Sequence, residues 1–142
     1  MIGLAADHAG FALKEFVRNL LDQENIPYKD YGTYSEIRTD YADYGHALAY
    51  GIEKGEVTSG IAICGSGNGI NMTLNKHQDI RAALCWNEEI ARLARAHNNA
   101  NVLVMPGRFV SEYEADKMVH AFMNTSFEEG RHRIRINKIP IC

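Results

Sequence analysis

The sequence contains no long apolar run and no excess of positive charge. No stretch approaches the ~20 consecutive apolar residues that a membrane-spanning helix needs. The first residues, MIGLAADHAG, reach Asp7 without the basic segment that begins a signal peptide. The formal net charge of −3 gives no electrostatic reason to expect a nucleic acid or an anionic membrane as a partner. These absences predict a cytoplasmic protein that binds neither nucleic acid nor membrane.

The sequence is also short of the residues that build disulfide frameworks and metal sites. Its three cysteines, Cys64, Cys85 and Cys142, are an odd number with no C-x-x-C pair among them. This pattern suggests neither a disulfide framework nor a zinc knuckle, and the six histidines show no close ligand spacing. We therefore expect reduced thiols and no bound metal.

Short β-branched runs alternate with longer segments of helical period along the whole chain. They predict strands at 2–6, 27–32, 59–64, 80–85 and 101–105. An apolar stripe from Phe11 to Leu21 predicts a helix, further helices are expected near 67–77 and 87–99, and Asn87 and Ser111 are suited to be N-caps. The alternation is typical of an α/β protein with a parallel sheet, and 142 residues suit one domain over 1–142. The longest irregular segment is expected at 32–44, as a binding loop or a mere connection.

The most distinctive loop is ICGSGNGI, residues 63–70, which follows a predicted strand. Ligands of open parallel sheets bind outside the carboxyl ends of the strands, so this loop is a candidate site. Glycines at 65, 67 and 69 let backbone N–H groups turn inward and form an oxyanion nest. The positive electrostatic field of these N–H groups would lower the pKa of the Cys64 thiol from about 8.5 towards neutrality, where a thiolate can act as a base.

Three known anion-binding patterns do not match this loop. The dinucleotide fingerprint G-x-G-x-x-G fails at Ile70, and so does the phosphatase pattern in which arginine follows a cysteine after five residues. The Gly-Lys-Ser/Thr of a P-loop is absent. Considered alone, Cys64 could be a small buried residue beside an ordinary turn.

A second charged cluster lies in EEGRHRIRINK, residues 128–138. If this segment is helical, Arg131 and Arg135 share a face and Arg133 points elsewhere. Two guanidinium groups on one face suit a phosphate, although a solvated basic helix end would show the same pattern. His8 and His97 are equally open to two interpretations, because an isolated histidine is often an ordinary surface or core residue.

Seven segments together closely resemble the type B ribose-5-phosphate isomerases, whose relatives include galactose-6-phosphate and allose-6-phosphate isomerases. They are DHAGFALK (7–14), DYGTYS (30–35), RTDYADY (38–44), ICGSGNGI (63–70), NKHQDIRAALC (75–85), ARLARAHNNANVL (91–103) and EGRHRIR (129–135). The resemblance implies a Rossmann-like three-layer α/β/α sandwich with a five-stranded parallel sheet in the order 2-1-3-5-4. It also implies a homodimer, or alternatively a tetramer, with active sites shared between subunits.

The resemblance also assigns roles to individual residues. It implies that Cys64 moves a proton between C1 and C2 of a phosphosugar, that His97 opens the sugar ring, and that the Ser66 hydroxyl takes part in catalysis. The implied substrate-binding set is Asp7, His8, Tyr41, Gly65, Ser66, Gly67, Asn68, Gly69, Asn98, Arg108, Arg131 and Arg135. Within it, His8 and the three arginines would hold the phosphate. Such an isomerase needs a base, an oxyanion hole and a phosphate clamp, but no cofactor and no metal.

Two residues depart from the family pattern. Ser66 stands where most relatives are expected to have threonine, so the methyl group that restricts the hydroxyl's rotamer is lost. Asn68 adds an amide where many relatives are apolar. These changes leave open whether the substrate is ribose 5-phosphate or a six-carbon sugar phosphate, allose 6-phosphate or galactose 6-phosphate. A non-catalytic phosphosugar-binding protein and a nucleotide-dependent oxidoreductase are rival functions, but the joint presence of Cys64 and His97 favours the isomerase.

The direction of the chain separates Cys64 from His97. A helix in a βαβ unit returns antiparallel to the strands, and about ten residues at 1.5 Å each displace its end by ~15 Å along the sheet. His97, near the end of the expected helix 87–99, should therefore lie towards the opposite edge of the sheet from Cys64. If one substrate meets both residues, His97 must come from the partner of a two-fold dimer.

Overall fold

The computed structural model describes residues 1–141, and its centre is a sheet of five parallel strands. The strands are β1 (Ile2–Ala6), β2 (Tyr28–Asp30), β3 (Ser59–Cys64), β4 (Ala82–Leu84) and β5 (Val102–Pro106). Their order across the sheet is β2-β1-β3-β5-β4, as predicted. β3 and β5 run in register until Cys64 lies beside Pro106, so their carboxyl ends open onto the same edge of the sheet.

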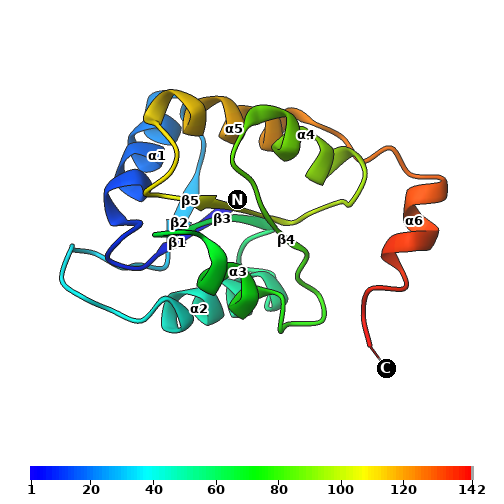
Figure 1. Cartoon of the computed structure of the whole chain (residues 1–142), viewed down its shortest axis with the longest axis horizontal. Helices are drawn as coiled ribbons and strands as arrows, with labels where there is room; N and C mark the ends of the chain where they lie inside the picture. The colour runs from blue at the N-terminus through cyan, green and yellow to red at the C-terminus, as the bar shows by residue number, and fades with distance from the viewer. Residues whose placement is uncertain (142) are drawn as a thin grey trace.

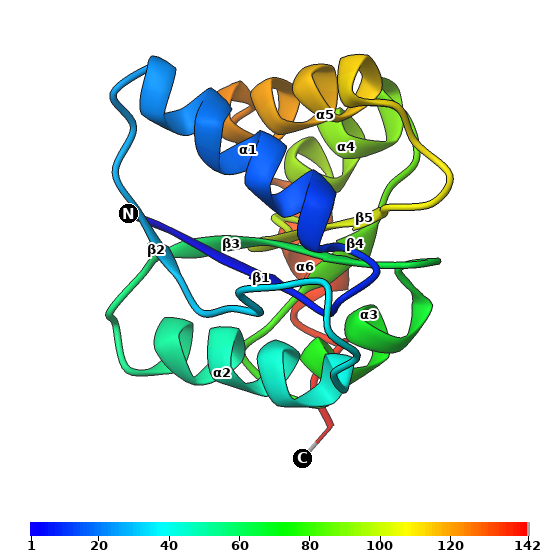
Figure 2. The ribbon, with the colours of Figure 1, turned by 90° about the vertical axis from the view of Figure 1, so that its left-hand side faces the viewer.

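Helices cover both faces of this sheet and complete three layers (Figures 1 and 2). One face carries α1 (Phe11–Gln23), α4 (Glu88–Ala96) and α5 (Glu112–Asn124), and the other carries α2 (Tyr41–Glu53) and α3 (Asn68–Leu74). Each helical layer packs its apolar residues against the sheet in a separate buried cluster, which is the arrangement expected when both faces of a parallel sheet are covered. The predicted α/β/α fold is confirmed.

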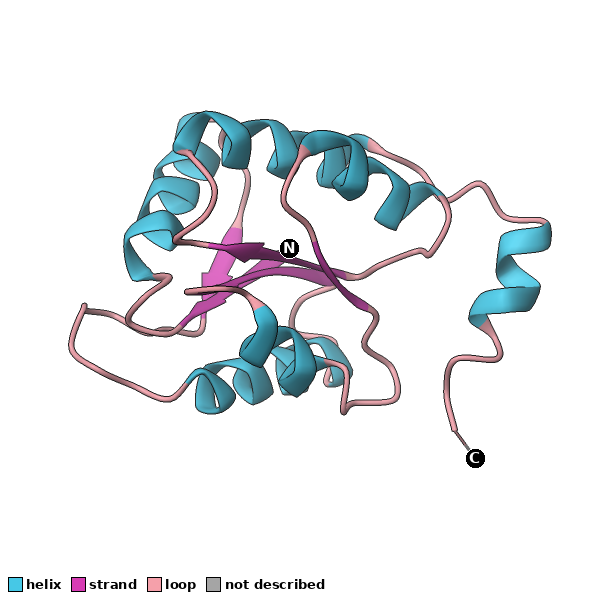
Figure 3. Ribbon diagram, in the orientation of Figure 1, coloured by secondary structure: helices cyan, strands magenta, loops and turns pink. Residues whose placement is uncertain are grey.

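The sixth helix, α6 (Arg131–Ile136), stands away from the three layers at one end of the molecule (Figures 1 and 3). Its exposed apolar side chains include Ile134, and Ile139 and Ile141 are exposed in the segment that follows. Among residues 1–141, none of the helices is both long enough and apolar enough to cross a membrane. Cys64 and Cys85 are buried free thiols, whereas Cys142 lies outside the described residues.

Local sequence signals placed most elements correctly. Asn87 accepts a hydrogen bond from the N–H of Ile90 at the start of α4, and Ser111 and Glu114 form the predicted capping box. The strands β1 and β3 have the predicted bounds, while β2 and β4 are only three residues long.

The irregular segment expected at 32–44 is shorter than predicted, because α2 already begins at Tyr41. The helix was hard to predict because it contains two glycines and its N-cap, Asp40, makes no side-chain capping bond. The glycines are required by close packing. A Cβ at Gly45 would crowd Thr73, and a Cβ at Gly51 would overlap the ring of Tyr31.

Candidate active site

A cavity of about 470 Å³ opens at the carboxyl ends of the strands, where the predicted binding loops converge. Many of the predicted site residues line it: Asp7, His8, Tyr41, Cys64, Gly65, Ser66, Gly69 and Arg108. Gly67 and Asn68 belong to the same loop but do not line the cavity. The sheet therefore collects residues from four separate parts of the sequence into one site.

Asp7 is held in place by the turn that follows β1. One of its carboxylate oxygens, Oδ1, accepts hydrogen bonds from the N–H groups of Ala9 at 3.0 Å and Gly10 at 3.1 Å. Gly10 has no room for a side chain, because a Cβ there would overlap the carbonyl of Ile63. The second oxygen of Asp7 makes no hydrogen bond within residues 1–141, so it can accept one from a ligand in the cavity.

His8 is fixed by two hydrogen bonds with Thr39, which is 31 residues away in the sequence. The N–H of His8 donates to the hydroxyl of Thr39, and the N–H of Thr39 donates to Nδ1 of the His8 ring, both at 3.2 Å. Because Nδ1 accepts a hydrogen bond, the ring proton lies on Nε2. His8 can therefore offer an N–H donor to an anion in the cavity.

Cys64 occupies the end of β3 in the cavity wall and is 4% exposed. Its carbonyl accepts a hydrogen bond from the N–H of Gly107, and the carbonyl of Gly65 accepts one from Arg108. These bonds fasten the loop after β5 to the loop after β3 and bring the Arg108 guanidinium beside Gly65.

Cys85 differs from Cys64 in its surroundings. Burial raises the pKa of the Cys85 thiol to about 12, which keeps it protonated and unreactive at neutral pH. Its Sγ donates to the carbonyl of Ala83 and does not line the cavity. Of the two described thiols, only Cys64 is placed to act on a ligand in this cavity.

The two unusual residues of the loop interact with each other. The side-chain amide of Asn68 donates to Oγ of Ser66 at 3.1 Å, and the backbone N–H of Asn68 donates to the same oxygen at 3.3 Å. Gly67, between them, has a φ of 81°, a left-handed conformation that disfavours a side chain. Asn68 thus restrains the hydroxyl of Ser66 at the edge of the cavity.

A second group of predicted residues lies at the opposite end of the sheet. His97, Asn98 and Arg135 line a cavity of about 370 Å³ between the end of α4 and α6. Figure 1 shows these two helix ends on the side of the sheet away from the loop that joins β3 to α3. Within one chain, the structure does not bring Cys64 and His97 into one cavity.

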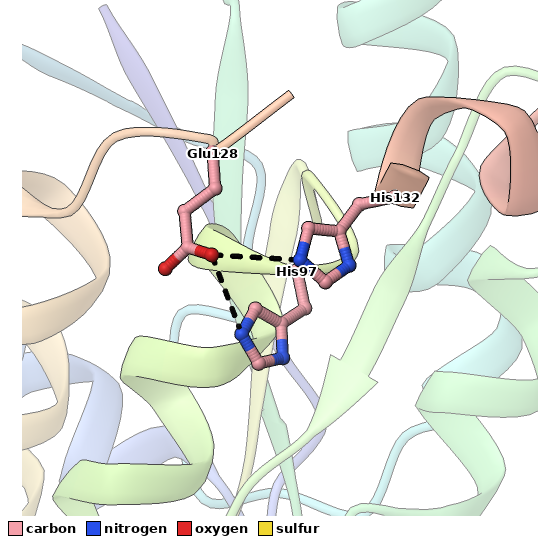
Figure 4. Close-up of side chains that lie close together, drawn as sticks. All are labelled: His97, Glu128 and His132. Atoms are coloured by element: carbon pink, nitrogen blue, oxygen red, sulfur yellow. Dashed lines mark ion pairs between the residues drawn. The ribbon is translucent and has the colours of Figure 1, made fainter. Parts of the chain in front are cut away.

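His97 contacts two residues that sequence reasoning missed. Figure 4 shows its ring beside that of His132, with Glu128 facing both. One oxygen of Glu128 lies 3.6 Å from Nε2 of His97 and 3.4 Å from Nε2 of His132, and the two rings stack with centroids 4.3 Å apart. The N–H of Glu128 also donates to the carbonyl of Ala96, at the end of α4.

The geometry of this trio favours a stacked histidine pair over a metal site. Their ligand atoms lie within 4.8 Å of one another, which is close enough to consider an ion. A ligating imidazole, however, points its nitrogen at the metal within the plane of the ring, at ~2.0–2.1 Å for zinc. Two rings that are 12° from parallel cannot both do this while stacked.

The arginines of α6 separate as the helical spacing predicted. Arg133 donates to both carboxylate oxygens of Glu129, so its charge is already paired. Arg131 and Arg135 are exposed and make no ion pair within residues 1–141, and Arg135 lines the cavity beside His97.

Known proteins resemble this chain over nearly its whole length. A sequence profile described as Ribose/Galactose Isomerase matches residues 2–139. The chain belongs to the ribose/galactose isomerase family. It is 39% identical over 138 residues to ribose-5-phosphate isomerase B of Escherichia coli, which covers 97% of this chain and 93% of the relative. The resemblance seen in the sequence motifs is confirmed.

Solved structures of this family superimpose closely on the chain. The ribose 5-phosphate isomerase of Thermotoga maritima matches with a TM-score of 0.96 and 47% identity, covering 98% of this chain and 96% of that one. Ribose-5-phosphate isomerase B of Mycoplasma genitalium, solved with bound ribulose 5-phosphate, matches with a TM-score of 0.92 and 40% identity, covering 97% and 92%.

The cavity wall contains further residues that no isolated motif identified as functional. Arg38, Thr39 and Asp40 line it from the segment before α2. Their motif, RTDYADY, was recognisable, but the bonds between Thr39 and His8 join distant parts of the chain and have no local signature.

Proposed function

We propose that this protein is a sugar-phosphate isomerase that interconverts ribose 5-phosphate and ribulose 5-phosphate. The observation that carries this proposal is the placement of Cys64 in the wall of a cavity that also holds the cationic Arg108 and the N–H donor His8. Membership of the family supports the reaction class, and the relative from Mycoplasma genitalium, with its bound ribulose 5-phosphate, supports a five-carbon substrate.

In the proposed mechanism, the Cys64 thiolate removes the proton from C2 of the open-chain aldose, and the electrons of that C–H bond form an enediolate. The same proton returns to C1, while the proton of the C2 hydroxyl passes to the C1 oxygen, so that C2 becomes the carbonyl carbon of the ketose. Backbone N–H groups from Gly65 to Gly69 and the Ser66 hydroxyl stabilise the negative oxygens. Asp7 and Tyr41 hold sugar hydroxyls. Because only protons move, this scheme needs no redox cofactor and no metal.

The ring-opening step requires an acid, and we propose that His97 supplies it from the partner subunit of a homodimer. The two cavities lie at opposite ends of one sheet, so a single chain offers only half of the catalytic set. Asn98, Arg131 and Arg135 would cross the same interface, where the two arginines would join Arg108 and His8 around the phosphate. The exposed apolar side chains of Ile134 in α6 and of Ile139 and Ile141 after it support an interface, because a partner subunit could bury them.

The test is a comparison of kcat/KM for ribose 5-phosphate, allose 6-phosphate and galactose 6-phosphate. We expect ribose 5-phosphate to have the highest value. A preference for either six-carbon sugar would keep the reaction class but overturn the substrate assignment. Tight binding of all three sugars without turnover would instead indicate a non-catalytic phosphosugar-binding protein.

A further inference from the structure

A third cavity, of about 520 Å³, lies at the amino ends of the central strands. It is lined by the starts of β1 and β3, the segment before β5 and the ends of α4 and α5. It shares no lining residue with either cavity of the proposed active site. Its volume is in the range of small-molecule sites, which run from about 300 to 1,000 Å³.

Two arginines, Arg81 and Arg95, line this cavity and hold Asn99 between them. Nε of Arg81 donates to the carbonyl of Asn99 at 3.0 Å, and Nη1 of Arg95 donates to the side-chain oxygen of Asn99 at 2.9 Å. Arg95 also donates to the carbonyls of Ala100 and Thr125. Three of these four bonds go to backbone carbonyls, and together they hold both guanidinium groups in position.

The bonds to carbonyl groups use only part of each guanidinium group. Within residues 1–141, three nitrogens of the two groups make no hydrogen bond: the two terminal nitrogens of Arg81 and Nη2 of Arg95. In the same residues, neither arginine has a carboxylate within 4.0 Å. No aspartate or glutamate lines the cavity. Arg92 lies on the same helix as Arg95, but its charge is neutralised by an ion pair with Glu89.

The surroundings disfavour the two positive charges. Burial lowers the pKa of Arg95, and the neighbouring charge of Arg81 lowers it further. Burial likewise lowers the pKa of Arg81, with a further contribution from Arg133 and a partial offset from Asp79. Because a carboxylate that could neutralise the pair does not line the cavity, an anion placed there would gain two charge-assisted contacts without displacing an ion pair.

We propose that the cavity between Arg81 and Arg95 is a second binding site, for a phosphate-sized oxyanion such as the phosphate group of a small metabolite. Both terminal nitrogens of Arg81 and Nη2 of Arg95 supply N–H donors for the oxygens of such an anion. The polar residues Thr58 and Ser59 line the same cavity. This site is independent of the proposed catalytic function, because it uses none of the residues assigned to the reaction.

The test follows the side-chain Nε–H signals of individual arginines in ¹H–¹⁵N NMR spectra while inorganic phosphate is added at constant ionic strength. Site-specific signals separate this cavity from the proposed catalytic phosphate clamp at Arg108, Arg131 and Arg135. We expect the signals of Arg81 and Arg95 to shift together along one saturating curve, while the exposed Arg92 does not respond. A titration with malonate should give a weaker response, because a dicarboxylate lacks the compact tetrahedral shape.

Two variants sharpen this test. Arg81→Gln should weaken phosphate binding, followed at Arg95, by roughly ten- to a hundredfold, which is the value of a lost charge-assisted bond; Arg92→Gln is the control of equal charge. Ser59→Asp places a carboxylate in the cavity, so it should abolish the response of Arg81 and Arg95 to phosphate. We expect this variant to keep the fold. If the signals of Arg81 and Arg95 shift with chloride as much as with phosphate, or shift no more than the signal of Arg92, the proposed site does not exist. An equal or stronger response to malonate would overturn the phosphate assignment.

Discussion

The two ends of the sheet differ in how firmly hydrogen bonds within the chain hold their candidate site residues. At the carboxyl ends of the strands, Asp7 is held by two backbone N–H groups, His8 is locked to Thr39, and the Cys64 loop is fastened to the loop after β5. At the other end, His97 at the end of α4 and Arg135 of α6 line one cavity, and α6 stands away from the three layers. The first end is preorganised within one chain, whereas in the proposed homodimer the second end is completed only by the partner subunit.

The largest expected effect tests whether the preorganised end holds the base. Cys64→Ala should fold normally but lose isomerase activity by at least ~10²–10⁴-fold, the usual contribution of a general base. The measurement is kcat with ribose 5-phosphate. Cys85→Ala is the matched control, because it removes a buried thiol outside the cavity; it should keep kcat while costing about 1 kcal/mol of stability. Near-native turnover of Cys64→Ala would mean that another group is the base.

The next experiment tests whether the two ends of different chains form one site. Inactive Cys64→Ala chains and inactive His97→Ala chains are mixed, unfolded and refolded together. In a dimer with shared sites, each heterodimer has one intact site and one site lacking both groups, so random pairing should restore about a quarter of wild-type activity. If heterodimers verified by mass remain inactive, the shared site is refuted.

The charges on α6 allow a smaller test at the end of the sheet that holds His97. Arg131→Ala and Arg135→Ala should each weaken binding of phosphorylated sugars by one to two orders of magnitude, since each removes a charge-assisted bond worth ~1.5–3 kcal/mol. Arg133→Ala should do much less, because its guanidinium is occupied by Glu129. The measurement is KM together with the Kd of a phosphosugar. Three equal effects would indicate a diffuse basic patch instead of an oriented clamp.

A contrast between local and long-range contacts explains what could be predicted from the sequence. Local signals were sufficient for the strands, for the caps at Asn87 and Ser111 and for the faces of α6, because each depends on residues within one turn or strand. The start of α2 was missed, since that helix depends on distant packing of Gly45 and Gly51 against Thr73 and Tyr31.

The candidate site divides in the same way. Residues that follow the strands could be placed at one edge of the sheet from topology alone, because parallel strands end together. The contacts that orient them could not be predicted: Thr39 meets His8 across 31 residues, and Glu128 lies against His97 only after the chain has passed through α5. Long-range contacts of this kind leave no periodic trace in a sequence.

The smallest expected effect concerns Ser66 and Asn68, within the preorganised end. A threonine at position 66 would have its rotamer restricted by the methyl group, whereas the serine here is restrained by the amide of Asn68. Asn68→Ala should therefore free the hydroxyl and lower kcat about threefold, corresponding to ~0.5–1 kcal/mol of lost side-chain order. Adding Ser66→Thr to Asn68→Ala should recover most of kcat, because the methyl group replaces the lost restraint, while Ser66→Thr alone should change it little. A double-mutant cycle measures this coupling. If the two substitutions act additively, the amide does not position the hydroxyl, and Asn68 affects the reaction by another route or not at all.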